Sequence, residues 1–115
     1  MIKEFILEVK KSKFIAISYE VHSVKEVDNI LSNLKKEHKK AKHIPYAYKI
    51  DNQIKKSDDK EPANTAGTPI YNLIINNNLN YILIVVIRYF GGIKLGTGLL
   101  TRSYLNAAKE VIYKQ

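Results

Sequence analysis

The segment YILIVVIRYFGGIKLGTG, residues 81–98, decides how this chain folds. Its first part, residues 81–87, is apolar at both sets of alternating positions, which is typical of a central strand that is covered on both faces. Its last part places four glycines within residues 91–98 and leads directly into a helical pattern. A buried strand, a tight loop and a helix therefore follow one another, and the number of glycines in the loop needs an explanation.

The glycine loop suits an anion site as well as a tight turn. Free N–H groups and a partial positive charge lie at a helix N-terminus, and Arg88, Lys94 and Arg102 flank this one. The spacing fails two nucleotide motifs, because Thr97 replaces the lysine of a Walker loop and Thr101 replaces the third glycine of a dinucleotide fingerprint. An anion site and a turn packed against neighbouring backbone remain equal alternatives. The residues whose backbone would form the site are Gly91, Gly92, Gly96, Thr97 and Gly98.

The rest of the chain predicts strands and helices on either side of this segment. Residues 4–21 alternate as a β-hairpin, and Ser23 followed by Glu26 is the capping box that opens a helix. The remaining expected elements are a strand at 43–50, a polar loop at 51–68, and helices at 69–77 and 97–114.

Composition and charge limit the kinds of protein this chain can be. It has 115 residues, no cysteine and a net charge of +8, and thirteen of its nineteen Lys and Arg lie in the first 57 residues. We expect one domain, without disulfides or thiolate metal sites, in a soluble cytoplasmic protein with no signal peptide or membrane span. The charge indicates nucleic acid or the ribosome as partner before a membrane surface, unless it reflects the lysine-rich codon use of an AT-rich genome.

Two further groups of side chains are candidates for chemistry. Asp58, Asp59 and Glu61 form an acidic cluster that could hold a hard cation, but a solvated acidic loop, or one that pairs with the chain's own cations, is the favoured interpretation. The three histidines lack metal-ligand spacing, so no metal or cofactor is expected. His43 is expected to form hydrogen bonds or to contact an anion.

Two tyrosines are candidates for contact with nucleic-acid bases. Tyr46 and Tyr48 share one face of the expected strand, and if they are exposed beside Lys42 and His43 they would stack on unpaired bases. If they are buried they belong to the core, which is the favoured interpretation for one of the pair.

Three segments together resemble the YigZ/IMPACT family: HIPYAY at 43–48, SDDKEPANTAGTPI at 57–70 and VVIRYFGGIKLGTGLLTRSY at 85–104. The resemblance implies an α/β (α+β) two-layer fold, with about four strands in a mixed sheet, two to three helices and a left-handed crossover. Domain IV of elongation factor G and the second domain of a small-subunit ribosomal protein have such a fold. Two departures weaken the likeness: Lys60, Ala63 and Asn64 interrupt the usual acidic loop, and Leu99 replaces a usual glycine.

The resemblance also carries expectations about organisation and function. Residues 1–115 would form an IMPACT-type core domain without the family's usual second domain. The family is described as translation-linked, which implies a module that binds RNA, the ribosome or a ribosome-associated protein. Its two glycine-containing loops, one with Gly67 and one over residues 90–98, would converge on one surface.

Two alternatives remain open at this stage. A small enzyme that holds a phosphorylated or nucleotide substrate at the glycine loop is the second functional hypothesis, with Asp58, Asp59 or Glu61 as metal ligand or base, although no acid–base pair can be placed within reach of the loop from sequence. We also expect an apolar patch near Phe90 and Tyr113 that drives self-association or partner binding, unless helices on opposite faces bury the central strand completely.

Overall fold

The strand β5 (Ile82–Tyr89) is the centre of a five-stranded sheet in the computed structural model, which describes residues 2–113 and 115. The strand order is β1-β2-β5-β3-β4, and every neighbouring pair is antiparallel. The other strands are β1 (Ile2–Val9), β2 (Ser12–Glu20), β3 (Tyr46–Ile50) and β4 (Gln53–Ser57). The predicted hairpin and central strand are therefore confirmed.

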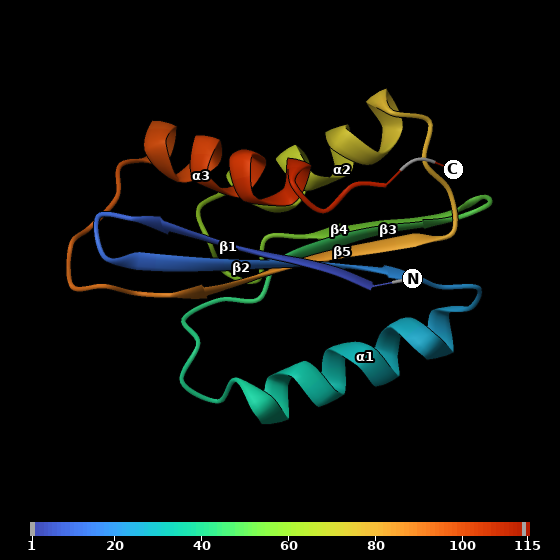
Figure 1. The fold of residues 1–115 in the computed structure, drawn as a ribbon, viewed down its shortest axis with the longest axis horizontal. Coiled ribbons are helices and arrows are strands. Elements are labelled where there is room, and N and C mark those ends of the chain that lie inside the picture. Colours follow the sequence, from blue (N-terminus) through green and yellow to red (C-terminus); the bar gives the residue numbers. More distant parts are fainter. Residues whose placement is uncertain (1, 114) are drawn as a thin grey trace.

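The sheet carries helices on both faces (Figure 1). On one face lies α1 (Val24–Glu37), and on the other lie α2 (Gly67–Asn76) and α3 (Thr97–Lys109). The side chains of β5 alternate between two cores: Leu83, Val85 and Ile87 pack with α1, while Ile82, Ile84 and Val86 pack with α2 and α3. All six are completely buried, which is why the strand is apolar at every position.

The α+β class is confirmed, but three details of the expectation need correction. The structure has three layers rather than two, because α1 covers the face opposite α2 and α3. The sheet has five strands rather than four, and all of them are antiparallel rather than mixed. The missing strand, β4, lies in the segment predicted as a loop, because its residues are polar and almost wholly exposed. Its lysines Lys55 and Lys56 are typical of a sheet edge protected from pairing with other chains.

One of the two helical crossovers must be left-handed. The strands β2 and β3 are parallel, since both are antiparallel to β5, and α1 connects them. The strands β4 and β5 are parallel, since both are antiparallel to β3, and α2 connects them. The connection from β2 to β3 and the connection from β4 to β5 cross the sheet in opposite senses, and the strands from which they start also run in opposite directions. If their helices lay on the same face, the two connections would therefore have the same hand. Because α1 and α2 lie on opposite faces, the hands differ, and one breaks the usual right-handed preference.

The helices begin close to the expected residues, but the last helix ends earlier than expected. The Ser23 side chain caps α1 by accepting a hydrogen bond from the Glu26 amide. The helix predicted over 69–77 begins two residues earlier, and the helix predicted to end at 114 ends at Lys109. Its apolar stripe is buried as expected, at Leu100, Tyr104, Ala108 and Val111.

The central strand β5 does not contribute to the expected apolar patch, because helices bury it from both sides, although the outer strands expose Ile2, Ile6 and Ile54. The exposed apolar side chains near the glycine loop are Phe90 and Ile93, which are 46% and 42% exposed. Within the part of the chain that the structure describes, no helix is long and apolar enough to cross a membrane.

Candidate nucleic-acid interface

The loop before α2 and the glycine loop after β5 lie side by side and line one hollow of about 310 Å³. Loop 58–66 contributes Glu61 and Pro62, and loop 90–96 contributes Phe90, Gly92, Lys94 and Leu95. The strand β5 supplies Arg88, the segment before β3 supplies Lys42 and His43, and α3 supplies Leu100. Segments that are far apart in sequence therefore meet at one end of the sheet.

Only part of the glycine content is explained by the turn itself. A Cβ on Gly91 would lie 2.1 Å from the Lys11 backbone carbonyl, so the loop packs directly on the β1–β2 hairpin. Gly92 has a φ of +87°, a conformation that other residues adopt at a cost. Gly96 has open space at its Cβ position, and Gly98 meets only an Arg102 nitrogen at 3.4 Å. The turn requires the first two glycines, whereas nothing among the described residues requires the last two.

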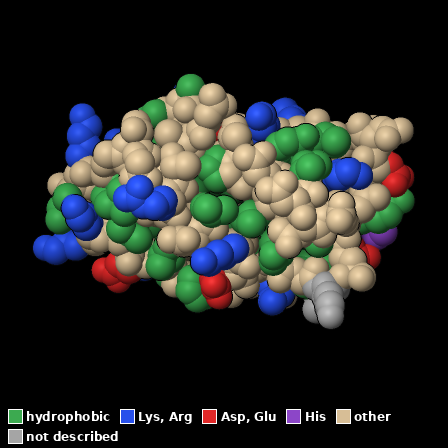
Figure 2. Space-filling model, turned by 90° about the horizontal axis from the view of Figure 1, so that it is seen from above, with side chains coloured by type: hydrophobic (Ala, Val, Ile, Leu, Met, Phe, Trp, Pro, Cys, Tyr) green, Lys and Arg blue, Asp and Glu red, His purple; other side chains and the backbone are tan. Residues whose placement is uncertain are grey.

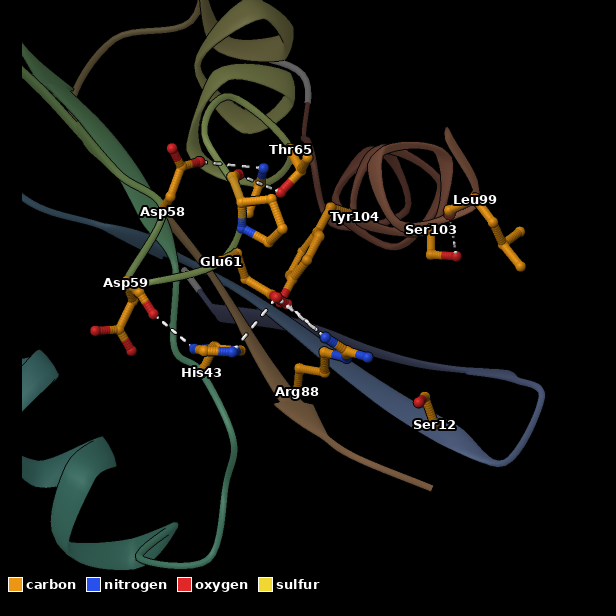
Figure 3. A network of polar contacts seen from close by, with 12 residues as sticks. Ser12, His43, Asp58, Asp59, Glu61, Thr65, Arg88, Leu99, Ser103 and Tyr104 are labelled. Atoms are coloured by element: carbon orange, nitrogen blue, oxygen red, sulfur yellow. Dashed lines mark hydrogen bonds and ion pairs between the residues drawn. The ribbon is translucent and has the colours of Figure 1, made fainter. Parts of the chain in front are cut away.

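Glu61 is the centre of a buried polar cluster beneath the hollow (Figure 3). Its carboxylate accepts two hydrogen bonds from Arg88 Nη1, at 2.9 and 3.1 Å, and a short one from the Tyr104 hydroxyl. The Glu61 side chain is only 2% exposed and that of Arg88 7% exposed. Because both charges are removed from water, loss of either partner would leave the other as an uncompensated buried charge and would destabilise the fold.

His43 and Tyr104 complete the surroundings of this carboxylate. The His43 Nδ1 donates to the Asp59 carbonyl at 2.7 Å, and its Nε2 lies 3.4 Å from Glu61 Oε1. Burial, and secondly the hydrogen bond to Glu61, raises the pKa of the Tyr104 hydroxyl far above its ordinary value. Tyr104 therefore stays protonated and acts as a donor. His43 thus forms a hydrogen bond within the fold, and its contact with a bound anion stays a prediction.

The other two carboxylates of the acidic loop hold backbone amides. Asp58 accepts hydrogen bonds from the amides of Asn64, Ala66 and Gly67, at 2.9, 3.2 and 2.8 Å, and so caps the start of α2. Asp59 Oδ2 accepts one from the Ile44 amide at 2.7 Å. Pairing with a cation, which the sequence analysis favoured beside a solvated loop, is observed for Glu61 with Arg88, whereas Asp58 and Asp59 bind backbone amides instead. Among residues 2–113 and 115, no group of three acidic or histidine side chains is placed to hold a metal ion.

Gly67 has a packing role at the start of α2. A Cβ there would lie 2.8 Å from the Ser57 backbone carbon, which is closer than real Cβ atoms approach. The close contact brings β4 and α2 together, so this glycine is explained by the fold.

Exposed cations surround the glycine loop without acidic partners. We use the term basic rim for Lys10, Lys11, Lys42, Lys94 and Arg102, all of which are exposed. None of them forms an ion pair with any residue that the structure describes. Figure 2 shows Lys and Arg side chains at the end of the molecule where the β1–β2 hairpin and the loop after β5 lie.

The structure separates the predicted site residues into three groups. Lys42, Lys94 and Arg102 lie at the surface around the glycine loop, and Lys10 and Lys11 join them although the sequence analysis did not select them. The sequence shows these two lysines as a pair in a hairpin turn, but the position of the pair beside Gly91 depends on the fold. Arg88 lies below them in the buried pair with Glu61.

The third group, the two tyrosines, lies on the opposite face of the sheet. Tyr48 is 7% exposed and belongs to the core under α1, which makes it unavailable for stacking on bases. Tyr46 is half-buried on the same face, with Lys55 Nζ 6.0 Å from its ring centre. Neither side chain is among the residues that line the hollow, and the favoured interpretation, that one of the pair belongs to the core, holds for Tyr48.

The fold defines the class of protein as an α+β domain with an antiparallel sheet and helices on both faces. Residues 10–112 match the family described as Impact N-terminal domain. The chain is 38% identical over 110 residues to IMPACT family member YvyE of Bacillus subtilis, covering 93% of this chain and 51% of that protein. It is 36% identical over 110 residues to IMPACT family member YigZ of Escherichia coli, covering 91% of this chain and 54% of that protein. The chain therefore belongs to the IMPACT family, as its motifs indicated.

Solved structures support the same fold. A crystal structure described as that of a hypothetical protein matches with a TM-score of 0.88 and 32% identity, covering 96% of this chain and 58% of the other. The two-domain translational regulator Yih1 matches with a TM-score of 0.54 and 24% identity, covering 90% of this chain and 43% of Yih1. This second likeness is one of fold. The chain spans about half the length of the bacterial relatives that it matches.

Proposed function

We propose that this domain is a translation-linked module that binds single-stranded RNA through the basic rim. The observation that carries the proposal is the set of five exposed cations around the glycine loop, which have no acidic partner among residues 2–113 and 115. Cations of this kind neutralise phosphates, and an unpaired cation gives up no internal ion pair when it does so.

Single-stranded rather than double-stranded RNA fits the shape of the surface. The rim borders a hollow and an exposed aromatic ring, Phe90, with Lys42 Nζ 5.2 Å from the ring centre. A single strand can place its backbone on cations and an unstacked base on an aromatic side chain, whereas bases in a duplex are not free to do so.

The translation-linked role rests on relatives rather than on geometry. Yih1 is described as a two-domain translational regulator, and its similarity to this chain is one of fold. A relative in Dictyostelium discoideum, Protein IMPACT homolog, is 34% identical over 108 residues and covers 90% of this chain. We carry their link to translation over to this domain as part of the proposal.

A titration of a short fluorescent single-stranded RNA, followed by anisotropy at low salt, tests the binding. The variant Lys11→Ala/Lys94→Ala is expected to bind about tenfold more weakly or worse than the unchanged chain, because two phosphate contacts are lost. The matched control Lys35→Ala/Lys36→Ala removes two exposed lysines of α1, on the far side of the sheet, and is expected to bind almost normally.

The outcomes separate the proposal from its competitors. No detectable binding to RNA at low salt would contradict it and would favour a protein partner instead. Equal losses in the two variants would show attraction by net charge rather than a site at the rim.

A further inference from the structure

The first strand, β1, leaves one edge and one face uncovered. It pairs only with β2, so its outer edge has no strand beside it among residues 2–113 and 115. On the side of α1 its residues Ile2 and Ile6 are 69% and 53% exposed, and neither belongs to the core under that helix. The alternate residues, such as Phe5, pack on the other core instead. The backbone N–H and C=O groups of an open edge can pair with a further strand.

The two edges of the sheet differ in how well they are protected from such pairing. The edge strand β4 has five residues, and Lys55 and Lys56 stand next to each other in it. The edge strand β1 has eight residues, of which only Lys3 is a cation and four are isoleucine, leucine or valine. Short strands and lysines discourage the addition of another strand, so β1 is the edge at which one is favoured.

A groove of about 310 Å³ lies between the uncovered face of β1 and the helix α1. The strand β1 contributes Ile2 and Glu4, the helix contributes Ile30 and Glu37, and β2 contributes Tyr19. Side chains of a strand added outside β1 would project on both faces of the sheet. Those on the side of α1 would lie beside Ile2 and Glu4, at the entrance to this groove.

The groove is acidic, although the chain has a net charge of +8. Glu4 and Glu37 are exposed, and neither forms an ion pair with a residue that the structure describes. Burial, and secondly the charges of Glu37 and Glu4, raises the pKa of the Tyr19 hydroxyl to about 12, so both carboxylates act on one group. Glu8 adds a third carboxylate to the same face of β1. Cations opposite these carboxylates would stabilise an added strand.

A second copy of β1 does not fit this edge. In an antiparallel pair, side chains that stand opposite each other lie on the same face of the sheet. Centred on Glu4, two copies of β1 would place the two Glu4 carboxylates opposite each other, and centred on Ile6 they would place Glu4 opposite Glu8. Centred on Phe5, they would place each carboxylate opposite an isoleucine. None of these registers gives a carboxylate a cation, so a strand of different sequence is required.

We propose that the outer edge of β1 binds an extended segment of a partner protein whose side chains facing α1 alternate between basic and apolar. Backbone hydrogen bonds add this segment to the sheet as a sixth strand. Its lysines or arginines stand opposite Glu4 and Glu8, and its apolar side chains cover Ile2 and Ile6. The groove shares no lining residue with the hollow at the basic rim, and the inference does not rest on the proposed RNA binding.

The test uses a synthetic peptide designed to pair antiparallel with β1, Thr-Lys-Val-Ile-Tyr-Lys-Thr-Val, with both ends blocked. Its lysines stand opposite Glu4 and Glu8 in the intended register. The control peptide carries glutamate in place of both lysines. Titration of each into the nitrogen-15-labelled chain is followed by NMR. The lysine peptide is expected to bind saturably and to shift the amide signals of β1, and to bind about tenfold more tightly than the glutamate peptide. Attraction by the net charge of the chain would favour the opposite order.

Charge reversal in the protein gives an independent check. The variant Glu4→Lys/Glu37→Lys is expected to bind the lysine peptide about tenfold more weakly and the glutamate peptide more tightly than the unchanged chain does. The matched control Asp28→Lys/Glu110→Lys reverses two exposed carboxylates that do not line the groove, and makes the same change in net charge. It is expected to keep the preference for the lysine peptide. Urea unfolding confirms that both variants are folded before affinities are compared.

The possible results decide between this partner and the alternatives. Failure of the lysine peptide to bind at millimolar concentration, or equal affinity for both peptides, would overturn the proposal. Amide shifts that leave β1 unaffected would overturn the assigned edge. Shifts of the β1 amides that depend on protein concentration without any peptide would show that a second copy occupies the edge, and would overturn the proposed partner. None of these results bears on RNA binding at the basic rim.

Discussion

Two loops of this domain lead from a strand to a helix, and they differ in how their charged side chains are partnered. In loop 58–66, Asp58, Asp59 and Glu61 are all engaged by amides or side chains of the same chain. In loop 90–96, Lys94 is exposed without an acidic partner, and the helix that follows has no side-chain cap at Gly96. The carboxylates of the first loop are bound within the molecule, whereas Lys94 of the second has no acidic partner among the residues that the structure describes.

The largest effect is expected where the acidic loop meets the sheet. Glu61→Ala removes one partner of the buried pair and leaves the Arg88 charge uncompensated, so the free energy of unfolding should fall by about 3–5 kcal/mol. The exposed Glu8→Ala is the matched control and should change it by about 0.5 kcal/mol or less. Urea denaturation measures both, and a small effect of Glu61→Ala would contradict the internal role of this loop.

The second prediction compares the starts of the two helices. Asp58→Ala removes the cap of α2, and stability should fall by about 1–2 kcal/mol. The reverse change at α3 is Gly96→Asp, which has open space and an ordinary φ of −67°. It should leave stability equal or slightly higher, while the added carboxylate weakens RNA binding by repelling phosphate. If Gly96→Asp leaves RNA affinity unchanged, the α3 end is not part of the interface.

The third prediction concerns the alkaline limit of stability. Burial raises the pKa of Tyr104 in the folded protein, so this hydroxyl ionises in the unfolded chain at a lower pH than in the folded one. The contribution of the protonated Tyr104 hydroxyl to the free energy of unfolding is fully present below about pH 10. Above that pH the contribution is lost, by about 1.4 kcal/mol per pH unit. Burial also raises the pKa of Tyr19, to about 12, so it adds to the same loss.

Comparison with Tyr104→Phe isolates the contribution of this hydroxyl. The variant loses the hydrogen bond to Glu61, so it should be less stable at neutral pH. Above pH 10 its stability should decline less steeply than that of the unchanged chain, in urea titrations at a series of pH values. Parallel pH profiles would contradict the buried, donating role of Tyr104.

The smallest effect is expected at a position where the acidic loop departs from the family pattern. Lys60 has a φ of +70°, the left-handed conformation that a glycine adopts without cost. Lys60→Gly should therefore raise the free energy of unfolding by about 0.5–1 kcal/mol. Lys60→Ala removes the same charge and keeps the Cβ, so it should give no gain. A gain of equal size in both would point to charge and not to backbone conformation.

The sequence predicted the elements of the fold well where apolar spacing was strong. The full burial of β5 could be read from seven consecutive apolar residues, and the start of α1 from Ser23 and Glu26. The strand β4 was missed because an exposed edge strand has no apolar face, so QIKKS looks like a loop. The faces that the helices cover depend on how the chain crosses the sheet, which spacing does not encode.

The site was only partly predictable for a similar reason. The cations and glycines of residues 88–102 were identified from their local pattern. The pairing of Glu61 with Arg88 joins residues 27 positions apart, and the place of Lys11 beside Gly91 depends on a hairpin 79 or more residues away. Arg88, taken from sequence as a surface cation, is buried and bound to Glu61 through Nη1, and its buried Nε has no hydrogen-bond partner among the described residues.

The most direct test of the central claim is the salt dependence of RNA affinity for three proteins. These are the unchanged chain, the rim variant Lys11→Ala/Lys94→Ala and the control Lys35→Ala/Lys36→Ala. A plot of log affinity against log salt should be steep for the unchanged chain and the control. It should be shallower for the rim variant by about 0.7 for each lysine removed, because each lysine neutralises one phosphate of a single strand. Identical slopes for all three proteins would contradict an RNA interface at the basic rim.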